Sequence, residues 1–174
     1  MKNIIFLSFA FVLFCGSVNI VNGQNSNNRF NVPRNYSFET EEDFRRYEPD
    51  ILNCINFLKN APVNDLSNNR RNINTFLLEW LSGVPYLTVT INGSVLELCE
   101  VNNNFLIIFL AGWTEYYLLN QNNYNERNGY LAGIETILDV YTRGNDVRND
   151  PAILNLVSIQ KEGKLLNWVI ERFR

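Results

Sequence analysis

The stretch INTFLLEWLSGVP, residues 73–85, decides the fold class of this chain. Its large apolar side chains recur at intervals of three and four residues, namely at Ile73, Phe76, Leu77, Trp80 and Leu81. That spacing gathers them on one side of an α-helix, in a wide apolar stripe that has to be buried against other elements. Gly83 stands where a left-handed C-terminal cap is expected, and Pro85 prevents the helix from continuing. We therefore predict a helix that packs within a larger helical core.

Helical spacing also occurs on both sides of this stretch. Ser37–Asn60 is amphipathic, and Pro49 is expected either to kink this helix or to begin a second one. Asn104–Leu119 is apolar nearly all round, which is typical of a central helix that packs on several sides. Asn125–Arg143 again carries its apolar residues on one face. These segments extend the helical prediction over most of the chain.

The C-terminal part contains clear helix boundary signals. Asp150-Pro151 has the pattern of an N-cap followed by proline at the first helical position. Gly144 is expected to close the helix before it, and Gly163 to separate the last two helices. We therefore predict two further helices between Asp150 and the C-terminus.

Residues 87–98 leave two alternatives open. Leu87–Ile91 alternates in polarity, and the turn-forming pair Asn92-Gly93 follows it, which is typical of a β-hairpin over Leu87–Leu98. The other alternative is a loop followed by a short helix. Because an isolated hairpin is marginally stable in water, it would have to lie on the helices. The sequence thus predicts a mainly α fold, a single compact bundle of five to seven helices with at most one short β-hairpin.

The N-terminus has the pattern of a cleavable secretory signal. Lys2 supplies a basic start, Ile4–Cys15 is an apolar run, and Val21-Asn22-Gly23 offers small or modest side chains for cleavage. The apolar run is shorter than the about 20 residues that span a membrane. We expect a signal peptide at 1–23, a disordered leader at 24–36 and one helical domain at 37–174, with no membrane span in the mature chain.

Charge and composition exclude several functional classes. Residues 24–174 carry 14 basic and 18 acidic side chains, without a basic block. Binding to nucleic acids depends on neutralising phosphates, so we expect no nucleic-acid partner. A chain of this size buries about two-thirds of its unfolded surface, so its core requires neither a metal nor a dense disulfide framework.

The chain contains no histidine. This excludes Ser-His-Asp and Cys-His catalysis and zinc sites with histidine ligands. Cys54 and Cys99 are too few for a thiolate zinc site, and we expect neither a metal nor a cofactor. In an oxidising compartment these two cysteines form a possible disulfide, while the alternative is that both are small buried hydrophobic residues that never meet.

Several acidic residues are candidates for acid–base chemistry. Glu135, Asp139 and Arg143 follow one another at intervals of four residues on one helix, where two carboxylates can raise each other's pKa. A solvated helix face that Arg143 partly neutralises is the simpler interpretation. Glu79 lies beside Trp80, which suggests a general acid in an apolar pocket, but helical phase places Glu79 off the apolar stripe. No residue is assigned a catalytic role.

The segment Trp113–Tyr117 combines three aromatic residues with Glu115, as the wall of a sugar-binding or peptide-binding groove does. Its aromatic residues also continue the apolar pattern of Phe109 and Leu110. Core aromatic residues whose polar tips find hydrogen-bond partners are the alternative. The residues of any binding site stay unassigned.

Several motifs resemble small exported proteins of unknown function from Bacteroidetes-type bacteria. They are Phe76–Pro85, Gly112-Trp113-Thr114, Leu131–Glu135 and Val140-Tyr141. The likeness extends from Tyr47 to Phe173. It implies a mainly helical fold and a periplasmic or secreted setting, and it brings no activity and no functional residue with it.

Two interpretations of function stay open. The first is a non-enzymatic exported protein, periplasmic or extracellular, that binds an unknown protein or component of the cell envelope. It follows from exclusion, because the core pattern is strong and no catalytic motif is present. The alternative is a histidine-independent hydrolase or lyase that uses Asp and Glu, with Glu79, Glu115 or Glu135 as candidates. An enzyme should gather two acids in one pocket, whereas a binding protein should expose an apolar patch.

Overall fold

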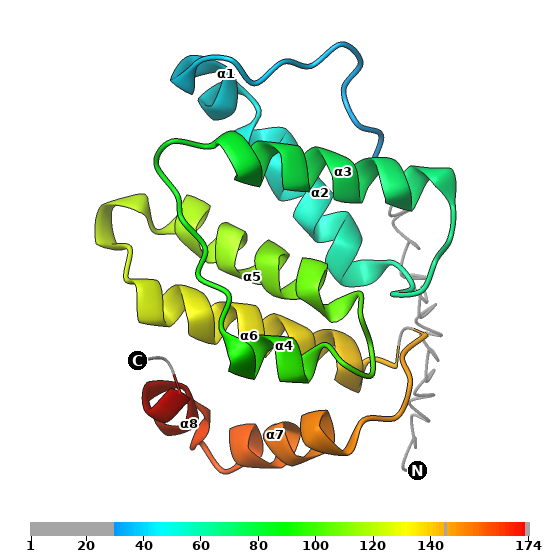
Figure 1. Ribbon diagram of the computed structural model, residues 1–174, viewed down its shortest axis with the longest axis vertical. Helices are drawn as coiled ribbons and strands as arrows, with labels where there is room; N and C mark the ends of the chain where they lie inside the picture. The colour runs from blue at the N-terminus through cyan, green and yellow to red at the C-terminus, as the bar shows by residue number, and fades with distance from the viewer. Residues whose placement is uncertain (1–29, 145, 173–174) are drawn as a thin grey trace, which may run out of the picture.

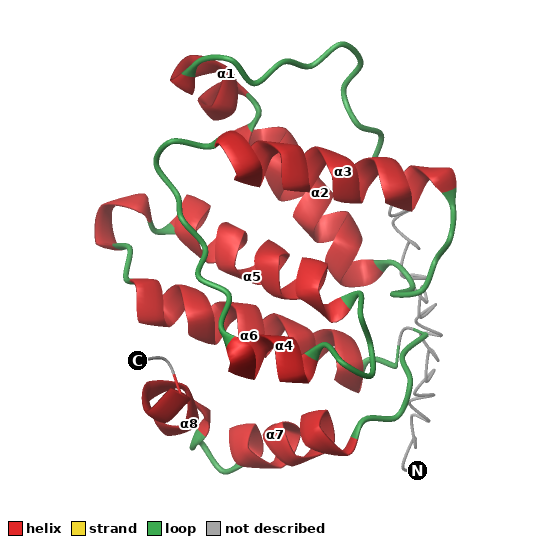
Figure 2. Ribbon diagram, in the orientation of Figure 1, coloured by secondary structure: helices red, strands yellow, loops and turns green. Residues whose placement is uncertain are grey.

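The computed structural model describes residues 30–144 and 146–172 (Figures 1 and 2). Within them the chain forms eight α-helices, one short 3-10 helix and no β-strand. The α-helices are α1 (Glu41–Arg46), α2 (Glu48–Asn60), α3 (Asn68–Gly83), α4 (Gly93–Leu98), α5 (Phe105–Leu119), α6 (Glu126–Thr142), α7 (Pro151–Lys161) and α8 (Leu165–Arg172). The 3-10 helix η1 (Gln121–Asn123) joins α5 to α6. The expected signal peptide at 1–23 lies outside the described residues.

The helices α5 and α6 form the centre of the molecule. They run side by side in opposite directions, with α2 and α3 on one flank and α7 and α8 on the other (Figure 1). The helix α4 lies in front of this pair in the same view. Ten residues of α5 are buried, which confirms the prediction of a central helix. None of the helices in the described part of the chain combines the length and the apolar character that crossing a bilayer requires.

Glycines allow the backbones of α5 and α6 to approach closely. A Cβ atom added to Gly112 of α5 would lie 2.6 Å from Cβ of Thr136 and 2.7 Å from the carbonyl oxygen of Ala132 on α6. On α6, a Cβ atom at Gly133 would lie 2.6 Å from the ring of Phe109. These distances are well below van der Waals contact, so a larger side chain at either glycine forces the helices apart.

Of the two alternatives for Leu87–Leu98, the hairpin is wrong. Residues 87–92 form a loop, and Gly93–Leu98 is the helix α4, as in the second alternative. Asn92 is its N-cap, because its Oδ1 atom accepts from the backbone N–H of Val95 at 3.2 Å. The same Oδ1 atom accepts a hydrogen bond from the hydroxyl of Tyr130 at 3.2 Å. These contacts favour a helix start over a hairpin turn at Asn92-Gly93.

The described residues form one α-helix more than the five to seven predicted. Pro49 occupies the first turn of α2 and separates it from α1, so Ser37–Asn60 contains two helices. Asp150 caps α7, with Pro151 at its first position, as predicted. Gly144 and Gly163 have the positive φ angles, 69° and 71°, that the expected helix ends require.

Gly83 does not adopt the left-handed conformation that its position suggests. It is the last residue of α3, and Val84 is the C-cap with a φ of −59°. A Cβ atom at Gly83 would lie 2.7 Å from Cζ of Phe44. The glycine therefore leaves room for the ring of Phe44, which packs against the end of α3.

Candidate functional site

Glu135 and Asp139 lie on α6, and Arg143 is the C-cap residue of this helix. Glu135 is exposed, and partial burial of its carboxyl group raises its pKa, with a further contribution from the negative charge of Asp139. Arg143 donates from Nε to the backbone carbonyl oxygen of Asp139 at 3.2 Å. Its Nη1 and Nη2 atoms donate to Oδ1 of Asn60 and to the carbonyl oxygen of Lys59, both at 2.9 Å. Arg143 therefore links the end of α6 to the end of α2.

The aromatic segment of α5 belongs mainly to the core. Trp113 is fully buried, and its Nε1 atom donates to the hydroxyl of Tyr124 at 2.9 Å. Tyr117 is also buried, so Trp113 and Tyr117 are core aromatics, whereas Tyr116 is half-buried. Glu115 forms an ion pair with Lys59 at 2.6 Å, in which both side chains are about one quarter exposed. This carboxylate joins α5 to α2.

Cys54 and Cys99 are both buried, free cysteines in the structure. Sγ of Cys54 donates a weak hydrogen bond to the carbonyl oxygen of Ile73 at 3.5 Å. Burial raises the pKa of both thiols, that of Cys99 to about 11. A thiol with a raised pKa is a poor nucleophile, so neither cysteine is suited to catalysis.

Residues 30–38, which we call the strap, lie across α3 (Figure 1). The ring centroid of Phe76 on α3 is 6.3 Å from that of Phe30 and 4.8 Å from that of Tyr36. Phe38 stacks on Phe44 at 5.2 Å. The polar composition of 24–36 suggested a disordered leader, but from Phe30 onward the aromatic side chains attach the chain to the core.

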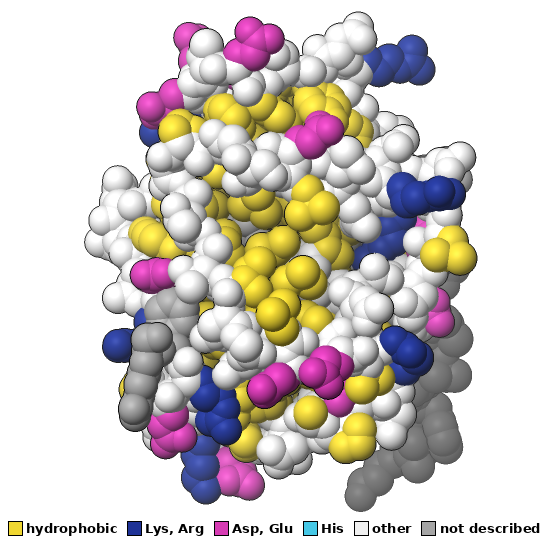
Figure 3. All heavy atoms as spheres, in the orientation of Figure 1, with side chains coloured by type: hydrophobic (Ala, Val, Ile, Leu, Met, Phe, Trp, Pro, Cys, Tyr) yellow, Lys and Arg dark blue, Asp and Glu magenta, His cyan; other side chains and the backbone are white. Residues whose placement is uncertain are grey.

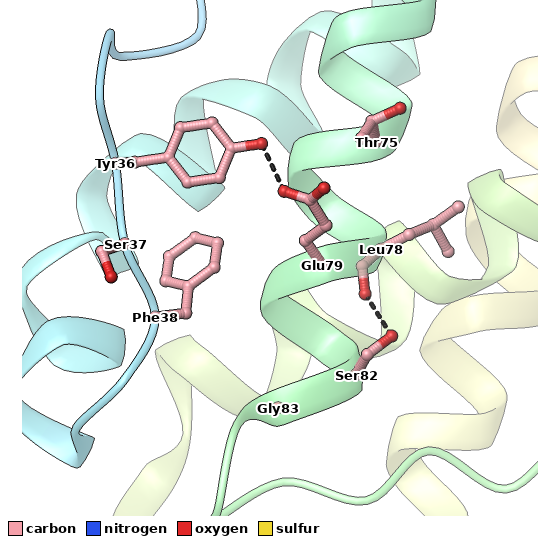
Figure 4. Close-up of a pocket in the computed structure, with 8 residues that line it drawn as sticks. All are labelled: Tyr36, Ser37, Phe38, Thr75, Leu78, Glu79, Ser82 and Gly83. Carbon is pink, nitrogen blue, oxygen red and sulfur yellow. Dashed lines mark hydrogen bonds between the residues drawn. The ribbon is translucent and has the colours of Figure 1, made fainter.

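A pocket of about 550 Å³ lies between the strap and α3, and Figure 4 shows its lining. We call it the strap pocket. Its lining consists of Tyr36, Ser37 and Phe38 from the strap and Thr75, Leu78, Glu79, Ser82 and Gly83 from α3. The hydroxyl of Tyr36 donates a hydrogen bond to Oε2 of Glu79. Burial, this hydrogen bond and the charge of Glu79 together raise the pKa of Tyr36 to about 12.

Two further hollows continue from the strap pocket toward α5. Their volumes are about 390 and 220 Å³, and both are lined by Leu78 and Leu110. We call them together the apolar groove. The other apolar residues that line it are Leu81, Val84, Leu87, Val89, Leu106 and Ile107. In Figure 3 a continuous apolar area occupies this face between α3 and α4, over α5, with acidic side chains above and below it.

Leu78 connects the three hollows. Its side chain is 44% exposed, and Figure 4 shows it directed away from the strap. Leu78 is off the apolar stripe that predicted α3, so the helical pattern did not require it for the core. An apolar residue on the polar side of a helix was the signal in the sequence that could have located this groove.

The three candidate acids lie on three different helices. Glu79 is on α3, Glu115 on α5 and Glu135 on α6, and no two of them line the same hollow among those described. Only Glu79 faces one of these hollows. Comparison of the chain with protein-family models, with curated proteins and with solved structures gave no match.

Proposed function

We propose that this protein is an exported, non-enzymatic binding module whose apolar groove holds an apolar segment of another polypeptide. The observation on which the proposal depends is the position of Leu78, which is 44% exposed where three hollows join. Exposed apolar areas with a polar rim are typical of interaction sites. Binding would remove this apolar surface from water, which is the main source of favourable free energy in most protein associations.

The shape of the site favours a linear segment of polypeptide. The three hollows meet at Leu78, and the two that form the apolar groove also share Leu110, so successive side chains of one segment can enter neighbouring hollows. The floor is apolar, and the polar groups at its border include Asn74, Ser82 and Thr88. These groups can bond to the peptide groups of the segment, while the leucines receive its side chains.

Export remains part of the proposal. Its support is the pattern of residues 1–23, a basic start followed by an apolar run and small residues. Expression of the full chain in a bacterial host, followed by intact-mass analysis of the exported fraction, tests this point. We expect the mass of a chain that begins at Gln24. Full-length material in the soluble cytoplasmic fraction would contradict export without affecting the groove.

The enzymatic alternative has no specific support. Acid–base catalysis with two carboxylates requires both in one site, at a separation set by the reaction. The candidates Glu79, Glu115 and Glu135 occupy different helices, and Glu115 is engaged with Lys59.

Peptide selection tests the groove directly. A random peptide library is selected on the purified protein, and binding of the selected peptides is measured by fluorescence anisotropy. We expect enrichment of Leu, Ile, Val and Phe, and a loss of affinity of about tenfold or more for Leu78→Asp, as for a central interface residue. Leu154→Asp on α7 is the matched control, because Leu154 is 46% exposed and does not line the groove. Equal binding by the two variants would overturn the proposal.

A further inference from the structure

The strap pocket and the apolar groove share two residues, Leu78 and Ser82. A segment bound in the groove can therefore extend one side chain into the pocket. The two hollows differ in chemistry. The groove is lined mainly by leucine and valine, whereas the pocket combines two aromatic rings, four hydroxyl groups and one carboxylate.

The carboxylate of Glu79 has no basic partner within the described ranges. Its Oε2 atom accepts from Tyr36, and no lysine or arginine among the described residues forms an ion pair with it. Arg71, two turns earlier on α3, points the other way, because its Nη2 atom donates to Oδ1 of Asn68 at 2.9 Å. The pocket thus contains a negative charge that this part of the chain leaves uncompensated.

The aromatic rings beside this carboxylate are held in place by the core. Phe38 stacks on Phe44 with an interplanar angle of 17° and meets Tyr47 edge-on at 5.5 Å. Figure 4 shows the rings of Tyr36 and Phe38 both directed from the strap toward Glu79. The faces of aromatic rings attract cations, and this attraction adds to that of a nearby carboxylate. Ordered rings also reduce the entropy that binding costs.

The hydroxyl of Ser82 is oriented as an acceptor. Its hydrogen is donated to the carbonyl oxygen of Leu78 at 2.7 Å, a bond drawn in Figure 4. Its lone pairs remain for a donor in the pocket. An ammonium group has three donors and no acceptor, which suits a pocket whose groups include a carboxylate and this hydroxyl.

We propose that the strap pocket binds the ammonium or guanidinium group of a lysine or arginine side chain, carried by the segment that occupies the apolar groove. This inference rests on the proposed function. Tyr36 acts as a positioning residue, because its hydroxyl orients the Glu79 carboxylate while Oε1 faces the cation. The preferred partner is therefore an apolar segment with one basic residue at the end that lies near the strap.

Nuclear magnetic resonance of the isotope-labelled full chain tests this inference. The probes are N-acetyl-lysine amide and, as an uncharged control, N-acetyl-norleucine amide. We expect the lysine probe to shift the backbone amide signals of Thr75, Glu79 and Ser82, and the norleucine probe to leave them unchanged. Glu79→Gln should weaken binding of the lysine probe by about three- to tenfold, the range of a single exposed ion pair with an aromatic contact.

Glu97→Gln is the matched control, because Glu97 on α4 is an exposed carboxylate that does not line the pocket. Circular dichroism verifies that both variants fold. Equal binding of the two probes, or equal affinity of Glu79→Gln and Glu97→Gln, overturns the inference.

The selected peptides separate this inference from the proposed function. If binding of the selected peptides requires Leu78 but is unchanged when norleucine replaces their lysine, the inference about the strap pocket fails. The proposed function of the apolar groove is then unaffected. If the lysine probe binds while no peptide depends on Leu78, the proposed function fails.

Discussion

Gly112 of α5 lies so close to Thr136 of α6 that a Cβ atom on the glycine would come within 2.6 Å of Cβ of the threonine. The carbonyl oxygen of Ala132 lies equally near, at 2.7 Å, so the obstacle includes backbone. The hydroxyl of Thr136 donates to this same oxygen at 2.8 Å and cannot easily turn aside. The central helix pair therefore depends on a hydrogen atom at position 112.

Replacement of Gly112 by alanine should destabilise the protein. Overpacking typically costs about 1–3 kcal/mol, and the better helix propensity of alanine, worth about 1 kcal/mol, offsets part of this. We expect a net loss in the free energy of unfolding, measured by urea denaturation. Gly93→Ala is the control, because no atom lies within 4 Å of a Cβ atom there. Equal stability of both variants would contradict the close packing of α5 on α6.

Asp150 should contribute to stability as the N-cap of α7. Its Oδ1 atom accepts from the backbone N–H of Ala152 at 2.9 Å and of Ile153 at 3.4 Å, and the residue is only 2% exposed. Asp150→Ala should lower the free energy of unfolding by about 1–2 kcal/mol. Asp150→Asn should retain most of the stabilisation that the N-cap contributes, because asparagine caps helices equally well. A loss as large for asparagine as for alanine would show that capping is not the cause.

Glu135→Gln should stabilise the protein at neutral pH. Partial burial and the charge of Asp139 raise the pKa of Glu135 in the folded state, so the folded protein holds this proton more tightly than the unfolded chain. The ionised carboxylate therefore lowers stability at neutral pH, and this penalty disappears as the pH falls below the ordinary value of 4.5. Urea denaturation at neutral and acidic pH measures the effect. A gain that is the same at both pH values would point to another cause.

The phenol of Tyr36 should ionise at a higher pH than an ordinary tyrosine does. Its pKa of about 12 exceeds the ordinary 10.0, so the stability that comes from the neutral phenol is fully present below pH 10 and is lost as the pH rises through about 12. The Cζ signal of labelled tyrosine, assigned with Tyr36→Phe, reports this titration. In Glu79→Gln the pKa should fall but remain above 10, since burial is the largest cause. Titration at the ordinary value would contradict the contact with α3.

Both described cysteines should resist thiol reagents in the folded protein. Burial keeps Cys54 and Cys99 protonated and out of contact with solvent. We expect slow labelling by iodoacetamide under native conditions and rapid labelling in urea, located by peptide mass mapping. A peptide pair joined through Cys54 and Cys99 in protein purified from an oxidising compartment would contradict the free thiols.

The sequence predicted best those features that depend on residues within a single helix. The apolar stripe at Ile73–Leu81 predicted α3, and Asp150-Pro151 predicted the start of α7, because spacing and capping depend on residues a few positions apart. The pair Asn92-Gly93 was ambiguous because it suits a hairpin turn and a helix start equally well. Tyr130 and Arg172, which bond to Asn92 from positions 38 and 80 residues away, support the helix start.

The candidate site was only partly predictable for the same reason. Helical phase placed Glu79 off the stripe of α3, where the structure has it. Its partner Tyr36 lies 43 residues earlier, in a segment whose polar composition indicated a disordered leader. The interval between Asp139 and Arg143 predicts a contact along the helix, and Nε of Arg143 donates to the carbonyl oxygen of Asp139 at 3.2 Å. The same guanidinium also reaches Lys59 and Asn60 on another helix. No local pattern contains these partners.

The link from Arg143 to the end of α2 also bears on the order in which the protein is made. The carbonyl oxygen of Lys59 belongs to the last turn of α2, and the group that satisfies it comes 84 residues later. A ribosome or an export channel delivers the polypeptide from its N-terminus, so α2 emerges long before this guanidinium. In a nascent chain, the carbonyl oxygen at the end of α2 therefore lacks this hydrogen bond until the segment that contains Arg143 has been delivered.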